Sequence, residues 1–191
     1  MLNNIAATLG GGVPVSLTDY ESISTVTVGS GGSSSITFSS IPSTYTHLQI
    51  RAIMRDQRTT YGNSGQSFRF NSDTGSNYSW HNLQGDGSSA TARSGANQDQ
   101  MYGNTAAGGG APTNDFGAMV VDILDYANTN KYKTVRMLSG VDINGTVAGY
   151  GGIVELMSGS WRNTAAITSV TVLPSNPNFV EYSSFALYGI K

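Results

Sequence analysis

From Tyr20 to the end of the chain, apolar side chains recur at every second position in short runs, and glycine, serine or asparagine residues separate the runs. In the stretch 47–55, HLQIRAIMR, Leu48 and Ile50 fall on one side of an extended chain, and Arg51 falls on the other side together with the apolar Ile53. A period of two is the period of a β-strand, whereas an amphipathic helix repeats every three to four residues. Because no helical pattern interrupts the runs, we expect strands that pair mostly antiparallel.

The pattern predicts an all-β fold, an antiparallel β-sandwich of jelly-roll type, over residues 19–191. Roughly ten runs follow one another at about the 8–12-residue spacing that is typical of sandwiches and barrels. The run 116–126, FGAMVVDILDY, is more continuously apolar, which indicates a central strand covered on both faces. Residues 85–115 contain few apolar side chains and much glycine, so we expect a long exposed loop with one short strand at most.

Residues 1–18 form a separate segment, which we interpret as a short N-terminal arm with a glycine-rich linker. Leu2, Ile5 and Leu9 recur at spacings of three and four, as they would on one face of a short helical turn. The glycines at 10–12 end that pattern, and so short a helix does not hold its shape alone in water. Two interpretations stay open: a frayed tail, or an arm whose apolar residues contact a neighbouring subunit.

Turn residues mark the ends of several runs. The glycine- and serine-rich residues 29–33 and the stretch 73–77, DTGSN, each lie between two alternating runs, and each predicts a hairpin. Asp86-Gly87 predicts another tight turn. The acidic and amide side chains of 73–77 also resemble a calcium loop, but such a loop ends in a bidentate carboxylate and no glutamate follows Asp73 at the required distance.

No grouping of residues along the chain predicts catalysis or a cofactor. The sequence contains no cysteine, which excludes thiol nucleophiles and thiolate zinc sites. His47 and His81 lie far apart, whereas a zinc site without cysteine usually takes two or three histidines and a carboxylate. The acidic residues that we considered as a catalytic pair are scattered: Asp115, Asp122, Asp125, Asp142 and Glu155. We therefore expect no enzyme, no cofactor and no metal.

Charge is unusually scarce, and its scarcity limits the possible partners. Charged residues make up 12% of the chain, about half of the roughly 25% that is usual. The formal net charge of −2 gives no general attraction for nucleic acid or for anionic lipid. No apolar run approaches the roughly 20 residues that a membrane helix needs. A weakly charged surface rich in hydroxyl groups instead suits a protein that packs against copies of itself or against other subunits.

Two sets of side chains are candidates for contact with partners. Arg51, Arg55 and Arg58 form a modest basic patch near Tyr61, and we interpret it as a contact to a partner subunit rather than to nucleic acid. Aromatic side chains are candidate stacking platforms for a glycan, although burial in the core is the favoured explanation for them. These aromatic candidates are Tyr61, Trp80, Tyr102 and Trp161.

Four stretches carry a resemblance to a known group of proteins. They are YESISTVTVGSGGSSSITFSSIPSTYTHLQIRA, FNSDTGSNYSW, DILDYANTNKYKTVRMLSG and the C-terminal SGSWRNTAAITSVTVLPSNPNFVEYSSFALYGIK. With these stretches the chain resembles small β-rich virion proteins of tailed phages, particularly marine and cyanobacterial ones. The resemblance extends over most of residues 19–191. It implies a structural role on the capsid or at the end of a tail fibre, and it brings no catalytic residues to this sequence.

The resemblance leaves two places in a virion open, and the sequence favours one of them. A fibre protein usually carries a coiled coil or a repetitive shaft, and the chain has neither heptads nor repeats. We therefore expect a capsid decoration, or cement, protein on the capsid surface. Such a protein would form a homotrimer and bind the major capsid protein. The alternative is a tail-fibre or adaptor component that binds a host glycan. An enzyme that degrades polysaccharide is the third and least favoured hypothesis.

Overall fold

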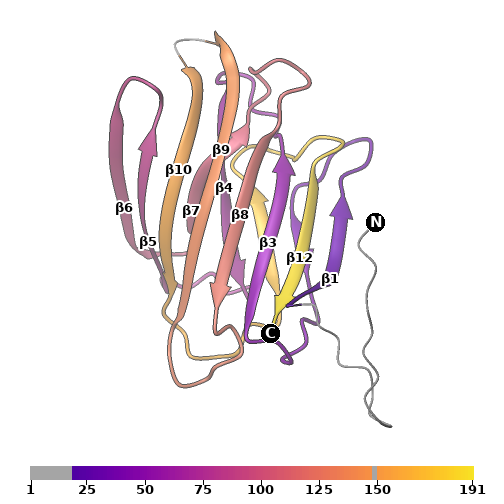
Figure 1. Ribbon diagram of the computed structural model, residues 1–191, viewed down its shortest axis with the longest axis vertical. Coiled ribbons are helices and arrows are strands. Elements are labelled where there is room, and N and C mark those ends of the chain that lie inside the picture. The colour runs from indigo at the N-terminus through magenta and orange to yellow at the C-terminus, as the bar shows by residue number, and fades with distance from the viewer. Residues whose placement is uncertain (1–18, 148–149) are drawn as a thin grey trace.

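The computed structural model describes residues 19–147 and 150–191, which form an antiparallel β-sandwich of two unequal sheets (Figure 1). In order across the large sheet, its strands are β1 (Tyr20–Thr27), β12 (Ser184–Ile190), β3 (His47–Met54), β8 (Gly117–Leu124), β9 (Lys133–Val147), β10 (Tyr150–Trp161), β5 (Tyr78–Gly85) and β6 (Ala90–Gln98). The small sheet contains β2 (Ile36–Phe38), β11 (Val170–Pro174), β4 (Asn63–Phe70) and β7 (Met101–Ala107). The expected all-β sandwich is thus confirmed. The proposed arm, with Leu2, Ile5 and Leu9, lies outside the described residues.

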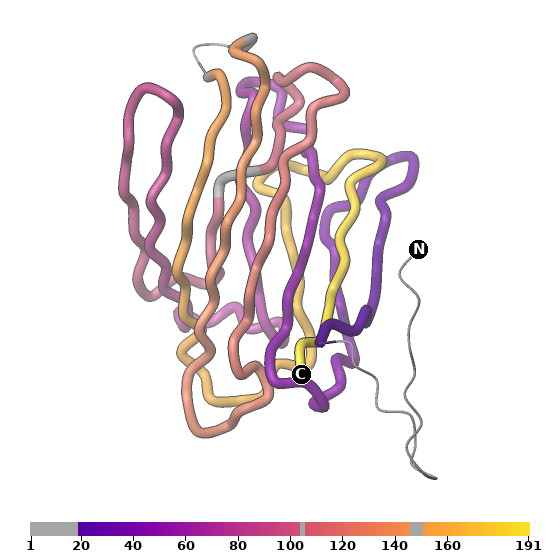
Figure 2. Tube along the Cα trace, viewed as in Figure 1, coloured from indigo at the N-terminus to yellow at the C-terminus, as the bar shows by residue number. Residues whose placement is uncertain are grey.

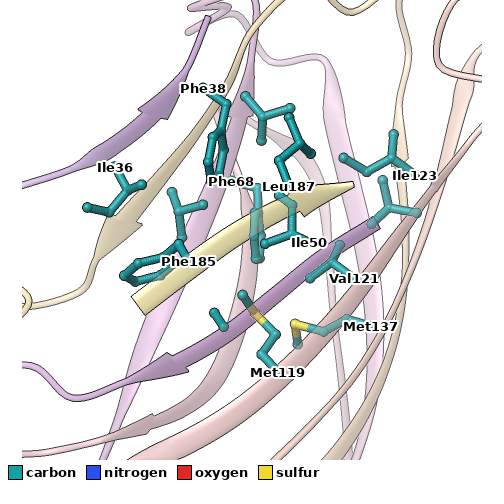
Figure 3. Packing of buried hydrophobic residues seen from close by; sticks show 14 of the residues in the cluster. Ile36, Phe38, Ile50, Phe68, Met119, Val121, Ile123, Met137, Phe185 and Leu187 are labelled. Atoms are coloured by element: carbon teal, nitrogen blue, oxygen red, sulfur yellow. The ribbon is translucent and has the colours of Figure 1, made fainter. Parts of the chain in front are cut away.

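The core lies between the two sheets and is built from the inward positions of the alternating runs. In Figure 3, Ile50 and Val121 of the large sheet lie close to Phe68 of the small sheet. An aromatic group extends the core toward one end of the sandwich, where the ring centroids of Phe70 and Trp161 are 5.7 Å apart. All five side chains are essentially inaccessible to solvent, so their burial supplies much of the hydrophobic stabilisation.

Two of the predicted turns exist, but they do not close hairpins. Residues 29–33 connect β1 to β2, and residues 73–77 connect β4 to β5. In both cases the flanking strands belong to different sheets, because β1 pairs with β12 and β5 pairs with β10. The hairpin expectation was therefore wrong at these two positions. The turn at Asp86-Gly87 does close a hairpin, between β5 and β6.

The segment 85–115 differs from the expected long loop, since it contains β6 and β7. The eight residues of β6 other than Gly95 are exposed, so the strand presents no apolar pattern that the sequence could reveal. It is held by its backbone pairing with β5 at the edge of the large sheet. Polar, exposed edge strands of this kind are a common way to keep a sheet from pairing with other molecules.

The large sheet is wider than the small one, and this mismatch leaves part of it uncovered. In Figure 1 the outer face of the large sheet faces the viewer, the small sheet lies behind it, and the β5–β6 hairpin extends at the left edge. Figure 2 shows the same hairpin at the edge of the large sheet, where β5 runs beside β10 and β6 is the outermost strand. The small sheet ends at β7, so β6 has no strand of that sheet as its cover.

The outer face of the large sheet is open to solvent at β8 as well. Along this strand buried and accessible residues alternate, with Met119 and Val121 buried and Ala118 and Val120 exposed. The run 116–126 is therefore covered on one face only, and the expectation of a strand covered on both faces was wrong. Its apolar outward positions belong to a surface described below.

Candidate functional site

The acidic and amide stretch 73–77 forms a turn that ties the two sheets together. Asp73 accepts hydrogen bonds from Trp161 Nε1, Asn77 Nδ2 and the backbone N–H of Gly75, each 2.8 Å long. The carboxylate is thus used by the protein itself. No group of three histidine, cysteine, aspartate or glutamate side chains among residues 19–147 and 150–191 is placed to hold a metal ion.

We expect Asp73→Asn to lower the free energy of unfolding by about 1–2 kcal/mol at neutral pH, the usual size for a lost charge-assisted hydrogen bond. Burial raises the pKa of Asp73, but the hydrogen bonds from Trp161, Gly75 and Asn77 outweigh it and lower the pKa overall. The stabilisation is therefore present above the unfolded pKa of about 3.9 and is lost as the pH falls through the lower folded value. Urea unfolding of the wild type and the variant at several pH values measures this.

Asp99→Asn is a suitable control for the Asp73 variant, because Asp99 makes an exposed ion pair with Arg69 and such pairs contribute little. The interpretation fails if the stability difference between Asp73→Asn and the wild type is the same at pH 7 and at pH 2.

Three of the candidate histidines and acids, His47, Asp122 and Asp125, have structural partners. His47 Nδ1 accepts the backbone N–H of Asp125 at 3.0 Å, whereas His81 is exposed on β5. Asp125 also pairs with Lys131. Asp122 accepts hydrogen bonds from Gln49 and Arg136 on the two neighbouring strands, β3 and β9. These contacts support the interpretation of each group as an element of the fold.

The three candidate arginines lie at three separate places in the structure. Arg51 stacks against the rings of Tyr20 and Tyr188 on the outer face of the large sheet. Arg58 lies over the ring of Tyr61 at 4.3 Å. Arg55 is only 6% exposed, so the expectation of a subunit contact was wrong for this residue.

Arg55 has a structural role instead. Its guanidinium donates hydrogen bonds to the backbone carbonyls of Gly109, Ala111, Pro112 and Asp115. It thereby holds the connection between β7 and β8 in place. Carbonyl oxygens of a buried loop need donors, and the planar guanidinium supplies several at once.

The first candidate functional surface is a group of exposed aliphatic side chains on the outer face of the large sheet. This aliphatic face consists of Ile53, Val120, Leu138, Val154, Leu156 and Leu83. Each side chain is between 38% and 58% exposed. Direct cross-strand partners run across the sheet in the order Val120, Leu138, Leu156, Leu83. These four side chains therefore form one continuous row, and Ile53 and Val154 lie two residues along the strands from the positions of that row.

The aliphatic face is hollowed rather than flat. A hollow of about 590 Å³ is bordered by Leu83 and Leu156, with Arg136 and Ser94 also at its border. A second hollow, bordered by Ile53 and Val120, lies nearer β3 and measures about 300 Å³. Soluble monomers rarely expose large continuous apolar areas, and where they do, the area usually binds another protein. Such a surface offers dispersion and hydrophobic contact, and His81, Arg93 and Arg136 also line the larger hollow.

The second candidate site is a small pocket lined mainly by polar side chains, next to the overhanging β5–β6 hairpin. It is lined by Arg58, Tyr61, Asn63, Gln84, Asp86, Thr91, Arg93 and Tyr102, and its volume is about 300 Å³. We call it the polar pocket. Residues of β4, β5, β6 and β7 meet there with the segment that precedes β4.

The polar pocket gathers three of the four aromatic candidates. Tyr61 and Tyr102 line it, and Trp80 packs against Tyr102 with ring centroids 5.9 Å apart. Trp161 is different, because it is 1% exposed in the core and donates its Nε1–H to Asp73. Sequence reasoning named the aromatic residues but missed the polar side chains that accompany them.

Comparison with known protein families, with curated proteins and with solved structures gives no match for this chain. The described part of the chain also contains no helix of the length and hydropathy required to cross a lipid bilayer. The functional interpretation therefore depends on the two surfaces described above and on the resemblance carried by the sequence.

Proposed function

We propose that this protein is a structural component of a tailed-phage virion, and specifically a capsid decoration protein that binds the shell and stabilises it. The observation that carries the proposal is the aliphatic face, a group of exposed side chains on the outer face of the large sheet, over which none of the described residues forms a layer. The proposal includes the homotrimer, the major capsid protein as the partner and the jelly-roll connectivity expected from the sequence.

The energetics of such a face suit a shell-binding role. Complete burial of one leucine-sized side chain contributes about 1.5–3 kcal/mol, so a few such contacts give useful affinity after the cost of association. The low charge of the chain reduces repulsion between neighbouring copies. In a trimer three such faces would dock together, and linked weak contacts multiply into high avidity. The role needs no reaction, which agrees with our expectation that the protein is not an enzyme.

Copy number in purified virions is the direct test of the decoration role. Quantitative mass spectrometry against the major capsid protein should find hundreds of copies per particle, because a decoration protein occupies repeated positions on the shell. A handful of copies per particle, or absence from the particle, would exclude the decoration role.

The alternative function is a tail-fibre or adaptor component that binds a host glycan, and one observation favours it. Tyr61, Trp80 and Tyr102 come from three separate parts of the chain and meet at the polar pocket. Labelling of virions with an antibody against the protein separates the two functions, because the label falls over the whole capsid in one case and at the tail in the other.

A further inference from the structure

We propose that the polar pocket binds one neutral pyranose unit of a glycan, with the sugar ring stacked on Tyr102 and its hydroxyl groups bonded to the surrounding polar side chains. The inference gives a ligand class to the glycan-binding alternative and rests on that alternative for its biological role. The binding site itself stands on the geometry of the pocket, wherever in a particle the protein is located.

The aromatic surfaces of the pocket are held in place before any ligand arrives. Trp80 lies against Gly95, its partner on β6, where a Cβ atom would approach the indole ring to 2.7 Å. The indole supports Tyr102, whose hydroxyl group packs over Gly65. Fixed aromatic rings lose little conformational entropy on binding, so contact with the apolar face of a sugar ring yields more affinity.

Tyr61 forms a second aromatic wall and is also held by a neighbour. The guanidinium of Arg58 lies 4.3 Å from the centre of its ring, which is the geometry of a cation–π contact. Tyr61 is itself accessible to solvent. The pocket thus offers aromatic carbon surface on two sides, as a pyranose ring requires.

The polar side chains of the pocket suit hydroxyl groups, which both donate and accept hydrogen bonds. Asn63 and Gln84 carry amides, which offer one acceptor and one two-hydrogen donor each. Thr91 adds a hydroxyl group. Hydrogen bonds from Ser88 and Ser89 hold the pKa of Asp86 well below its usual range, so this carboxylate stays an acceptor.

The charges around the pocket balance, which favours a neutral ligand over an anion. Two guanidinium groups, of Arg58 and Arg93, line the pocket together with the carboxylate of Asp86. The buried carboxylate of Asp56 interacts electrostatically with Arg58 and also with Arg55. Arg58 is therefore already engaged by Asp56 and by the ring of Tyr61, which leaves one guanidinium, of Arg93, and one carboxylate, of Asp86, to face a ligand.

Two residues with unsatisfied polar atoms lie along the strand face of the pocket residue Gln84, although neither lines the polar pocket itself. The amide nitrogen and oxygen of Asn82, which is 5% exposed, have no hydrogen-bond partner among the described residues, and neither does Trp80 Nε1. Both residues share a face of β5 with Gln84, which lines the pocket. Unsatisfied buried polar groups are costly, so a ligand or ordered water that reaches them is favoured. A volume of about 300 Å³ is small among ligand pockets and suits one sugar unit.

Titration of the full chain with single methyl pyranosides tests the inference. Isothermal calorimetry or protein-observed NMR should show saturable millimolar binding of at least one neutral pyranoside, with methyl glucoside, galactoside, mannoside and N-acetylglucosaminide as the probes. Methyl glucuronide and sialic acid methyl glycoside form the acidic arm and should bind more weakly. Tyr102→Ala and Arg93→Ala should each weaken binding at least tenfold.

Two controls keep the pocket test decisive. Arg93 is exposed on β6, so Arg93→Ala reports on binding even if Tyr102→Ala unfolds. Tyr132→Ala removes an exposed tyrosine that does not line the pocket, and it should leave binding unchanged. The inference is overturned if no neutral pyranoside saturates the protein, if only the acidic sugars bind, or if Arg93→Ala binds like the wild type. None of these outcomes bears on copy number in the virion, so failure of the pocket and failure of the decoration role are distinguishable.

Discussion

Replacing Leu138 and Leu156 together by glutamine is expected to lower the affinity of the protein for its particle at least tenfold. The two residues lie directly opposite each other on β9 and β10, in the middle of the aliphatic face. Because 58% of Leu138 and 51% of Leu156 is exposed in the free protein, docking can bury only about half of each side chain, so their loss removes about 1.5–3 kcal/mol, and each 1.4 kcal/mol is a factor of ten in affinity. Binding of the purified protein to particles that lack it, measured by co-sedimentation, gives the comparison.

A matched pair on the other sheet controls for the change in chemistry. Thr37 and Thr171 also lie directly opposite each other, on β2 and β11. Their replacement by glutamine should leave particle binding unchanged. If the leucine double variant keeps wild-type affinity while both variants fold, the aliphatic face is not the docking surface and the proposed function loses its main support.

Replacing Arg55 by methionine is expected to lower the free energy of unfolding by about 1–3 kcal/mol, the usual size when acceptors that a buried group satisfied lose their donor. The change leaves the carbonyls of Gly109, Ala111 and Pro112 without this donor, and that of Ala111 is buried. Such a loss is a large share of the total stability of a domain of this size, which is typically 5–15 kcal/mol. Chemical denaturation followed by tryptophan fluorescence measures it.

Arg136→Met is the control for the Arg55 variant. Arg136 makes an exposed ion pair with Asp122 at 3.0 Å, and a pair of that kind contributes about 0–1 kcal/mol. Equal destabilisation by the two variants would show that Arg55 does not hold the β7–β8 connection in the way the structure indicates.

Most strands were predictable from the sequence, with β6 and β7 as the exceptions, whereas the pairing partners of the strands were not. Alternation is a local property, so the inward positions of β3, such as Leu48 and Ile50, are buried as expected. The stretches 29–33 and 73–77 turn the chain as their residues require. After such a turn the chain can pair with the preceding strand or cross to the other sheet. The choice depends on contacts between residues distant in sequence, and the turn residues do not determine those contacts.

Apolar residues of the aliphatic face were visible in the sequence, but the apolar pattern was compatible with two different structures. A continuous apolar run such as 116–126 arises when both faces of a strand are covered within one chain. It also arises when one face is reserved for another molecule, as with Val120 on β8. Only the absence of a layer over the outer face of the described sheet separates the two cases.

The polar pocket left a weaker signal that sequence reasoning missed. Asn63 and Gln84 are polar residues at buried positions of β4 and β5, where a two-layer sandwich would ordinarily place apolar side chains. Arg93 stands on an edge strand whose pattern is featureless. Polar residues at inward positions were therefore the detectable sign, and their convergence with Tyr102 required the fold.

The uneven width of the two sheets has a consequence for local motion. The β5–β6 hairpin extends past the small sheet, and β6 buries no side chain of its own. Amide hydrogens along β6 will therefore exchange with solvent through opening events that cost far less than global unfolding. The polar pocket lies beside β6, a strand that opens easily. An occupant that bridges β6 to β7 therefore adds its binding free energy to the local stability of this strand.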